Sequence, residues 1–163
     1  MRRSTEAAFI GLGANLGDPR AALDAAFVAL ARLPDSTLRA ASSLYRSAPI
    51  DSGGPDYLNA VVQLETRLAP HALLAELRRI ERVQGRERPY RNAPRTLDLD
   101  LLLYGERRVQ TDSLTVPHPR LHERAFVLLP LAELAPHLMI PGHGAIGALL
   151  PAVAAQRIAR MTA

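Results

Sequence analysis

Two aspartates stand one residue apart at the head of a strand-like run, APRTLDLDLLLYG, which spans residues 93–105. Side chains alternate between the two faces of a strand, so Asp98 and Asp100 should share one face with Thr96 and Leu102. The other face should carry the intervening leucines: Leu97, Leu99, Leu101 and Leu103. Same-face neighbours lie about 7 Å apart, so two ionised carboxylates there repel each other unless a cation lies between them. The sequence therefore predicts a metal ion or arginines at this pair, with a solvated strand end as the alternative.

A dense group of arginines precedes this strand: Arg82, Arg86, Arg88, Arg91 and Arg95. Mutual repulsion makes such a group costly unless it meets anions. Guanidinium groups bind phosphate oxygens in a fork, and arginines beside paired carboxylates are the usual parts of a phosphoryl-transfer site. A solvated basic loop is one alternative. An RNA-binding sheet is another, but it needs aromatic side chains on its inner strands, where the sequence offers only Phe9 and Tyr57.

Two other motifs contain residues that could bind a nucleotide or a metal ion. The glycines of GLGANLG, residues 11–17, are spaced like a dinucleotide-binding turn, but the second strand then lacks the acidic residue that would hold a ribose. We therefore interpret these glycines as serving a turn and close packing. His118 and His122 stand four residues apart and could ligate a metal on a helix, but no third ligand is near. We favour His118 as a donor to phosphate and His122 as a surface residue.

The hydropathy pattern predicts the order β-α-β-β-α-β, an α+β arrangement of the ferredoxin-like type with an antiparallel sheet flanked by helices. Strands are expected at residues 7–13, 37–50 and 57–68, and the run with the two aspartates supplies the fourth. The first helix should start at Pro19 with Asp18 as its N-cap, and the second should run from Pro70 to Gly85. The apolar stripe of the second helix is expected at Leu73, Leu74, Leu77, Ile80 and Val83.

The remaining residues are expected to add one strand and two helices to this core. The sequence RRVQ, residues 107–110, predicts an added edge strand after the turn at Gly105. Residues 123–136 predict a helix despite Pro130, and residues 144–159 predict a terminal helix.

The bulk composition limits the class of protein. The chain has 163 residues, which predicts a single domain over 1–163, and a net charge of +4 that suits an anionic small molecule as well as nucleic acid. It contains no cysteine, so disulfides and thiolate metal sites are excluded. The N-terminal residues lack the apolar core of a signal peptide, and no apolar run is long enough for a membrane helix. We expect a monomer in the cytoplasm without membrane or nucleic-acid partners.

Several longer stretches, taken together, closely resemble one enzyme family. These are GLGANLGD, SSLYRSAPI, PDYLNAVVQLET, IERVQGRERPYRNAPRTLDLDLLLYG and LTVPHPRLHERAFVLLPLAELAP. The resemblance is to the 6-hydroxymethyl-7,8-dihydropterin pyrophosphokinases of folate biosynthesis, and it covers nearly the whole chain. It implies a ferredoxin-like fold and the transfer of the β and γ phosphates of ATP, as one unit, to the pterin hydroxymethyl oxygen with release of AMP. Two Mg²⁺ ions are implied as cofactors and ATP as co-substrate.

The resemblance also implies roles for individual residues. Asp98 and Asp100 would be the metal ligands and, with Arg86 and Arg95, would form the catalytic group. Residues facing the nucleotide would be Glu81, Arg88, Thr115, His118 and Arg124. Tyr57 and Phe126 would sandwich the pterin ring, Asn59 would bind its polar edge, and Ser47 would line the pocket.

Overall fold

The computed structural model describes residues 4–49, 54–84 and 97–161 of the chain. Its main sheet has the strand order β10-β3-β4-β1-β5, and β2 also pairs with β4. All these pairings are antiparallel. The strands are β1 (Glu6–Ala14), β2 (Ser36–Ala41), β3 (Tyr45–Ser47), β4 (Tyr57–Thr66), β5 (Asp98–Tyr104) and β10 (Ile158–Arg160). With α1 (Pro19–Ala31) after β1 and α2 (Pro70–Gln84) after β4, the core follows the predicted ferredoxin-like order.

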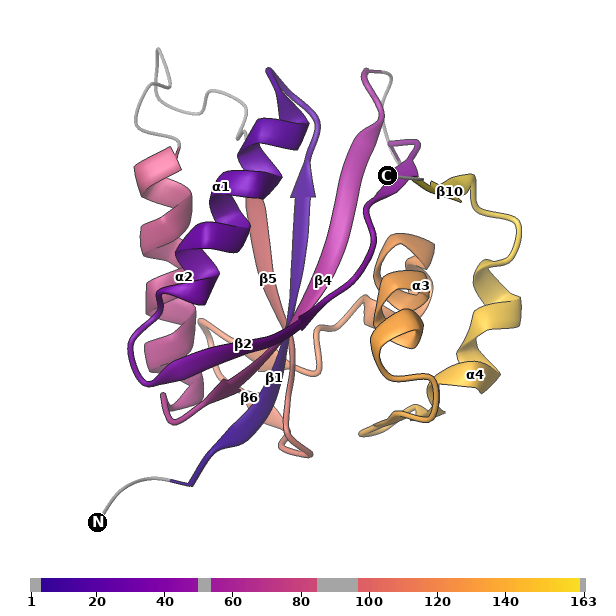
Figure 1. Cartoon of the computed structure of the whole chain (residues 1–163). Helices are drawn as coiled ribbons and strands as arrows, with labels where there is room; N and C mark the ends of the chain where they lie inside the picture. Colours follow the sequence, from indigo (N-terminus) through magenta and orange to yellow (C-terminus); the bar gives the residue numbers. More distant parts are fainter. Residues whose placement is uncertain (1–3, 50–53, 85–96, 162–163) are drawn as a thin grey trace.

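Helices cover both faces of this sheet. Figure 1 shows α1 and α2 on one face, with α3 (Ala125–Leu134) and the short α4 (Ile146–Leu149) on the other. Leu23 and Leu77 from α1 and α2 pack in one core with Ile10, while Leu128 from α3 belongs to a second core with Val61. Because both faces are buried, the central strands are almost continuously apolar, and a polar residue on them stands out.

The sequence signals at the starts of α1 and α2 are confirmed. The Asp18 side chain accepts a hydrogen bond from the Ala21 backbone N–H at 3.1 Å, as an N-cap does, and Pro70 opens α2. One member of the predicted stripe is wrong: Val83 is 46% exposed, whereas Leu73, Leu77 and Ile80 are buried. The predicted end of α2 at Gly85 lies outside the described residues.

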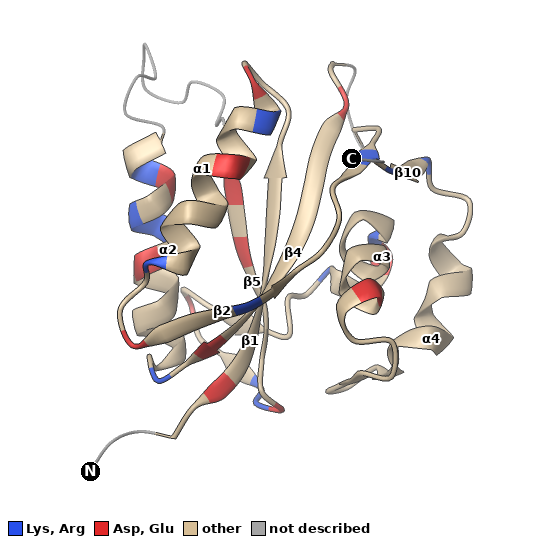
Figure 2. Cartoon of the chain, viewed as in Figure 1, with Lys and Arg blue, Asp and Glu red and all other residues tan. Residues whose placement is uncertain are grey.

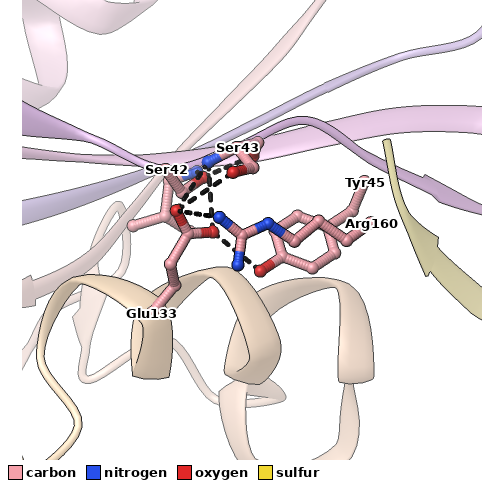
Figure 3. A network of polar contacts seen from close by, with 6 residues as sticks. Ser42, Ser43, Tyr45, Glu133 and Arg160 are labelled. Carbon is pink, nitrogen blue, oxygen red and sulfur yellow. Dashed lines mark hydrogen bonds and ion pairs between the residues drawn. The ribbon is translucent and has the colours of Figure 1, made fainter. Parts of the chain in front are cut away.

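The predicted strand over 37–50 is in fact two strands, β2 and β3, separated by residues 42–44. The Ser42 hydroxyl accepts a hydrogen bond from the Val61 N–H at 2.9 Å and so takes a place in the ladder that a backbone group would fill. Glu133 of α3 binds the next residues (Figure 3): its carboxylate accepts bonds from the Ser43 N–H and hydroxyl and from the Tyr45 hydroxyl, the last at 2.7 Å. The sequence did not indicate this break, because its partners come from distant elements.

An ion pair connects β10 to the Glu133 carboxylate. The Arg160 guanidinium of β10 lies 3.5 Å from the Glu133 carboxylate. Burial opposes ionisation of Glu133, but the hydrogen bonds from Tyr45 and Ser43 and the charge of Arg160 outweigh it and lower the pKa of Glu133 below 4.5. Burial and the bond to Glu133 raise the pKa of Tyr45 to about 12. The four residues thus join α3, β3 and β10.

The strict alternation predicted for β5 fails at its far end. Ile10 of β1 pairs with Leu101 while Phe9 pairs with Leu103, so Leu102 is an extra residue in the ladder. An extra residue reverses the faces beyond it. Leu103 therefore lies in the core under α3 with Leu102 instead of sharing the face of Leu99. The two aspartates precede this bulge, so their shared face is as predicted.

The decorations after β5 differ more from prediction. The strand within RRVQ forms as β6 (Val109–Gln110), but it pairs with β7 (Thr115–Val116) in a separate small sheet. The helix predicted over 123–136 forms as η1 (Leu121–Glu123) followed by α3, which contains Pro130. The terminal helix is wrong: after the hairpin β8 (Met139–Ile140) and β9 (Gly144–Ala145), only α4 and the 3-10 turn η2 (Leu150–Val153) form before β10. Pro151 cannot donate the hydrogen bond needed to continue the helix.

We expect Glu133→Ala to lower the free energy of unfolding by about 1–2 kcal/mol at neutral pH, because it leaves the donors at Ser43 and Tyr45 without an acceptor. The loss is measured by urea unfolding. A native pKa below 4.5 means that the carboxylate stabilises the fold above that pH and that the contribution is lost as pH falls through the native pKa. The difference between the wild type and the variant should therefore shrink in acid.

Asp24→Ala is the matched control, since Asp24 also pairs with an arginine but both side chains are about 60% exposed. An exposed pair contributes little, so this variant should unfold like the wild type. An equal loss in both variants would show that the Glu133 network has no special role.

Candidate active site

A row of residues crosses the centre of the sheet from β4 through β1 to β5. Asn59 pairs with Gly13, and Gly13 pairs on its other side with Asp98. Two residues earlier on β1, Gly11 pairs with Val61 on one side and with Asp100 on the other. Figure 2 shows the acidic positions on β5 beside β1. The glycines place no side chain between Asn59 and the two carboxylates, so the middle of this face is bare.

A cavity of about 330 Å³ lies over this bare patch. Its lining includes most of the predicted site residues that the structure describes: Ser47, Tyr57, Asn59, Asp98, Asp100, Arg124 and Phe126. Gly11, Gly13 and Pro49 also line it. The predicted residues come from β3, β4, β5 and the start of α3, so the fold gathers them from distant parts of the sequence.

The amide of Asn59 is held in one orientation. The buried Ser47 hydroxyl donates to Asn59 Oδ1 at 2.6 Å, so Nδ2 is the group that turns toward Gly13. A methyl group added at Gly13 would lie 3.2 Å from Nδ2. The cavity therefore presents a fixed amide donor on one side and two carboxylates on the other.

Aromatic and cationic groups complete the lining. Tyr57 starts β4, and Phe126 lies in the first turn of α3. The Arg124 guanidinium lies 5.4 Å from the centre of the Phe126 ring, within the range of a cation–π contact. The cavity can thus take a flat ring with polar edges and an anionic group near Arg124.

His118 lies beside β5 without lining this cavity. Its backbone N–H donates to the Leu102 carbonyl at 2.9 Å. Burial lowers the pKa of His118 below 6.5, Asp100 opposes this, and Arg124 and Arg120 lower it further, so the ring is neutral at pH 7. Nδ1 accepts a bond from the Arg120 N–H at 3.2 Å, which leaves the ring proton on Nε2 as a donor. Thr115 is exposed on β7 and also lies outside the cavity lining.

Glu81 lies behind β5, away from the cavity lining. Its carboxylate accepts a hydrogen bond from the Leu99 N–H at 2.8 Å, and Arg78 donates to the same carboxylate at 2.7 Å. The Glu81 side chain is only 10% exposed. The other predicted residues of this group, Arg86, Arg88 and Arg95, lie outside the described residues.

The donor set suits a hard cation that brings other ligands with it. Asp98 and Asp100 supply carboxylate oxygens on one face, and no group of three or more acidic, histidine or cysteine side chains that could hold a metal occurs within residues 4–49, 54–84 and 97–161. Mg²⁺ is typically bound by one or two carboxylates together with water and substrate phosphates. The pair therefore fits Mg²⁺ bound with a polyphosphate better than a metal held by protein alone.

Comparison with known proteins places this chain in a family. The family model of 7,8-dihydro-6-hydroxymethylpterin-pyrophosphokinase (HPPK) matches residues 9–136. The chain belongs to the HPPK family. The resemblance drawn from the sequence is thereby confirmed, and so is the enzyme class, because the curated relatives are named as pyrophosphokinases.

Two bacterial relatives match at nearly full length, and both are named 2-amino-4-hydroxy-6-hydroxymethyldihydropteridine pyrophosphokinase. The protein of Haemophilus influenzae is 44% identical over 155 residues, which cover 94% of this chain and 97% of the relative. That of Pseudomonas aeruginosa is 46% identical over 154 residues, covering 94% and 95%. A mitochondrial folate synthesis bifunctional protein of Pisum sativum is 43% identical over 79% of this chain, which spans 25% of that protein.

Solved structures confirm the fold. A crystal structure of Plasmodium falciparum HPPK-DHPS A437G with STZ-DHP matches with a TM-score of 0.70 at 14% identity, covering 91% of this chain and 45% of that one. The present chain therefore spans less than half of the larger protein. In HPPK enzymes the sheet is ferredoxin-like, as the βαββαβ order predicted.

The turn predicted for the glycines of residues 11–17 is confirmed at Gly17, whose φ is 67°. Sequence reasoning missed that Gly11 and Gly13 lie on the face of Asp100 and Asp98 and line the cavity. The dinucleotide alternative does not fit, since that site needs paired parallel strands on either side of the helix, whereas β4 lies between β1 and β2 and is antiparallel to both. The signal was available: two glycines at a spacing of two match two aspartates at the same spacing.

We expect Gly13→Ala to weaken binding of the pterin by about two- to tenfold, because the new methyl group displaces the Asn59 amide and costs roughly one hydrogen bond. The dissociation constant is measured by fluorescence titration with the pterin. Gly147→Ala on α4 is the control, since its methyl group would meet nothing within 4 Å and the residue does not line this cavity. Equal losses in the two variants would argue against the contact with Asn59.

Proposed function

We propose that this protein transfers the terminal pyrophosphoryl group of ATP to 6-hydroxymethyl-7,8-dihydropterin, as the names of its relatives indicate. The bond from the β phosphorus of ATP to the oxygen that bridges it to the α phosphorus breaks, and a bond forms from the β phosphorus to the hydroxymethyl oxygen. AMP leaves with the bridging oxygen, and the hydroxyl proton is released. The observation that carries the proposal is the cavity over Gly11 and Gly13, with an amide on one side and two carboxylates on the other. We further propose that the protein acts as a cytoplasmic monomer in folate synthesis.

The pterin would occupy the part of the cavity next to Asn59. Its polar edge would accept a hydrogen bond from Asn59 Nδ2, which Ser47 orients. Tyr57 and Phe126 would contact the ring, since large aromatic side chains bind flat heteroaromatic ligands well. The hydroxymethyl group would then point toward Asp98 across Gly13.

The phosphates of ATP would lie along β5. Arg124 offers a cation in the cavity lining, and neutral His118 offers its Nε2 proton without adding charge. Thr115 and the arginines 86, 88 and 95 are proposed to complete the nucleotide site, Arg86 and Arg95 at the transferred phosphates. Aligning two bound reactants in this way can supply much of the rate enhancement.

Asp98 and Asp100 are the residues proposed to hold two Mg²⁺ ions together with the phosphates. The chemistry that bound Mg²⁺ supplies is neutralisation of negative charge on the phosphate oxygens. Phosphoryl transfer proceeds through a loose transition state, so alignment and charge neutralisation matter more than a general base. The protein groups therefore have the task of binding, orienting and excluding water.

Product analysis tests the reaction class. The protein is mixed with ATP, Mg²⁺ and 6-hydroxymethyl-7,8-dihydropterin, and nucleotides are separated by chromatography, with the pterin omitted as the control. We expect AMP that forms only when the pterin is present, together with a diphosphorylated pterin. Formation of ADP would mean single-phosphoryl transfer, and absence of turnover in folded protein would favour a nucleotide- or RNA-binding module.

We expect Asp98→Asn and Asp100→Asn each to lower kcat by at least about a hundredfold, because each removes a charge on which metal and phosphates depend. Steady-state kinetics and circular dichroism together separate lost catalysis from lost structure. Asp24→Asn on the exposed face of α1 is the control and should keep full activity. Unchanged turnover in either β5 variant would disprove the two-metal assignment.

A further inference from the structure

β5 lies at the end of the main sheet, and within the described residues it pairs only with β1. In an antiparallel ladder, alternate residues turn their N–H and C=O groups away from the neighbouring strand. Leu99 is such a residue, because both of its backbone groups bind side chains of α2. The Glu81 carboxylate accepts from its N–H at 2.8 Å, and the Arg78 guanidinium donates to its C=O at 2.9 Å.

The two side chains also bind each other, so they form a closed unit with the backbone of Leu99. Arg78 Nη1 donates a hydrogen bond to Glu81 Oε1 at 2.7 Å, while Glu81 Oε2 accepts the hydrogen bond from the Leu99 N–H. Both oxygens of the carboxylate are therefore engaged with protein. We name Arg78, Glu81 and the Leu99 backbone the α2–β5 clamp.

The position of the clamp connects it to the candidate metal ligands. Leu99 stands between Asp98 and Asp100 in the sequence. Its N–H belongs to the peptide that joins it to Asp98, and its C=O belongs to the peptide that joins it to Asp100. The clamp thus binds both peptide groups at the outer edge of β5, while the aspartates line the cavity on one face of the sheet.

We propose that Arg78 and Glu81 are positioning residues that fix the spacing and direction of Asp98 and Asp100 for metal binding. The inference rests on the proposed function for the identity of the metal complex. In this proposal Glu81 affects the nucleotide site through the backbone of β5 and does not contact ATP. Groups that orient metal ligands typically change metal affinity or activity by about 10- to 100-fold when mutated.

The test compares two ion pairs on the same helix. Arg78→Met removes both hydrogen bonds of the guanidinium at similar side-chain length, and Arg78→Lys keeps a cation that can reach one acceptor. Glu76 and Arg79 form the matched control, because they are also three residues apart and 2.8 Å from each other but are more exposed. Arg79→Met therefore repeats the chemical change without touching β5.

Two readouts address positioning separately from turnover. Binding of Mn²⁺, measured by electron paramagnetic resonance with a non-hydrolysable ATP analogue, reports the metal site directly. Amide hydrogen exchange at Leu99 reports the clamp itself. Binding of the pterin alone and of the analogue without metal are measured alongside.

For Arg78→Met we expect Mn²⁺ affinity to fall about 10- to 100-fold and Leu99 to exchange faster, with pterin affinity unchanged. Arg78→Lys should lie between this variant and the wild type, and it carries the test if Arg78→Met does not fold. Arg79→Met should match the wild type. Wild-type Mn²⁺ affinity in a folded Arg78 variant would overturn the proposal.

A direct contact with ATP would give a different result. The analogue would then bind the Arg78 variants more weakly by the same factor with and without metal, and this would also overturn the proposal. Failure of the proposed reaction remains distinguishable, because it would appear as absent AMP formation in the wild type. Metal and hydrogen-exchange measurements need no turnover.

Discussion

The absence of side chains at two positions of β1 is the constraint on which the site depends. Gly11 and Gly13 lie on β1 in the middle of the sheet, which has helices packed on both faces. A close-packed interior leaves few voids, so a cavity at the centre of a sheet must be built by omitting atoms. The omission leaves open space between Asn59 and Asp98, and the proposed pterin site uses that space.

The charged strand and the central fold could be predicted from local sequence. The alternation of Asp98 and Asp100 with leucines, the N-cap at Asp18 and the proline at Pro70 all depend on neighbours a few residues away. Family resemblance then supplied Asn59, Tyr57 and Phe126, which no spacing rule connects. The structure brings these residues to one cavity, whereas their roles toward ligands stay proposals.

The failures share a different cause. The break between β2 and β3 depends on Glu133, some ninety residues later in the chain, and a single-strand pattern cannot show it. Leu103 changed faces because of a bulge opposite Phe9, which is a property of the pairing and not of either strand alone. Gly11 and Gly13 were interpreted without their partners on β5. Each error came from a contact between elements whose alignment the sequence alone does not give.

The α2–β5 clamp also affects how readily β5 can pair with a strand of another molecule. An outermost strand with free backbone groups can pair with a strand of another molecule and start aggregation. At Leu99 those groups are already bound by an arginine and a glutamate, and a foreign strand would have to displace two charged side chains to reach them. The residues proposed to position Asp98 and Asp100 therefore also protect this strand from pairing with another molecule.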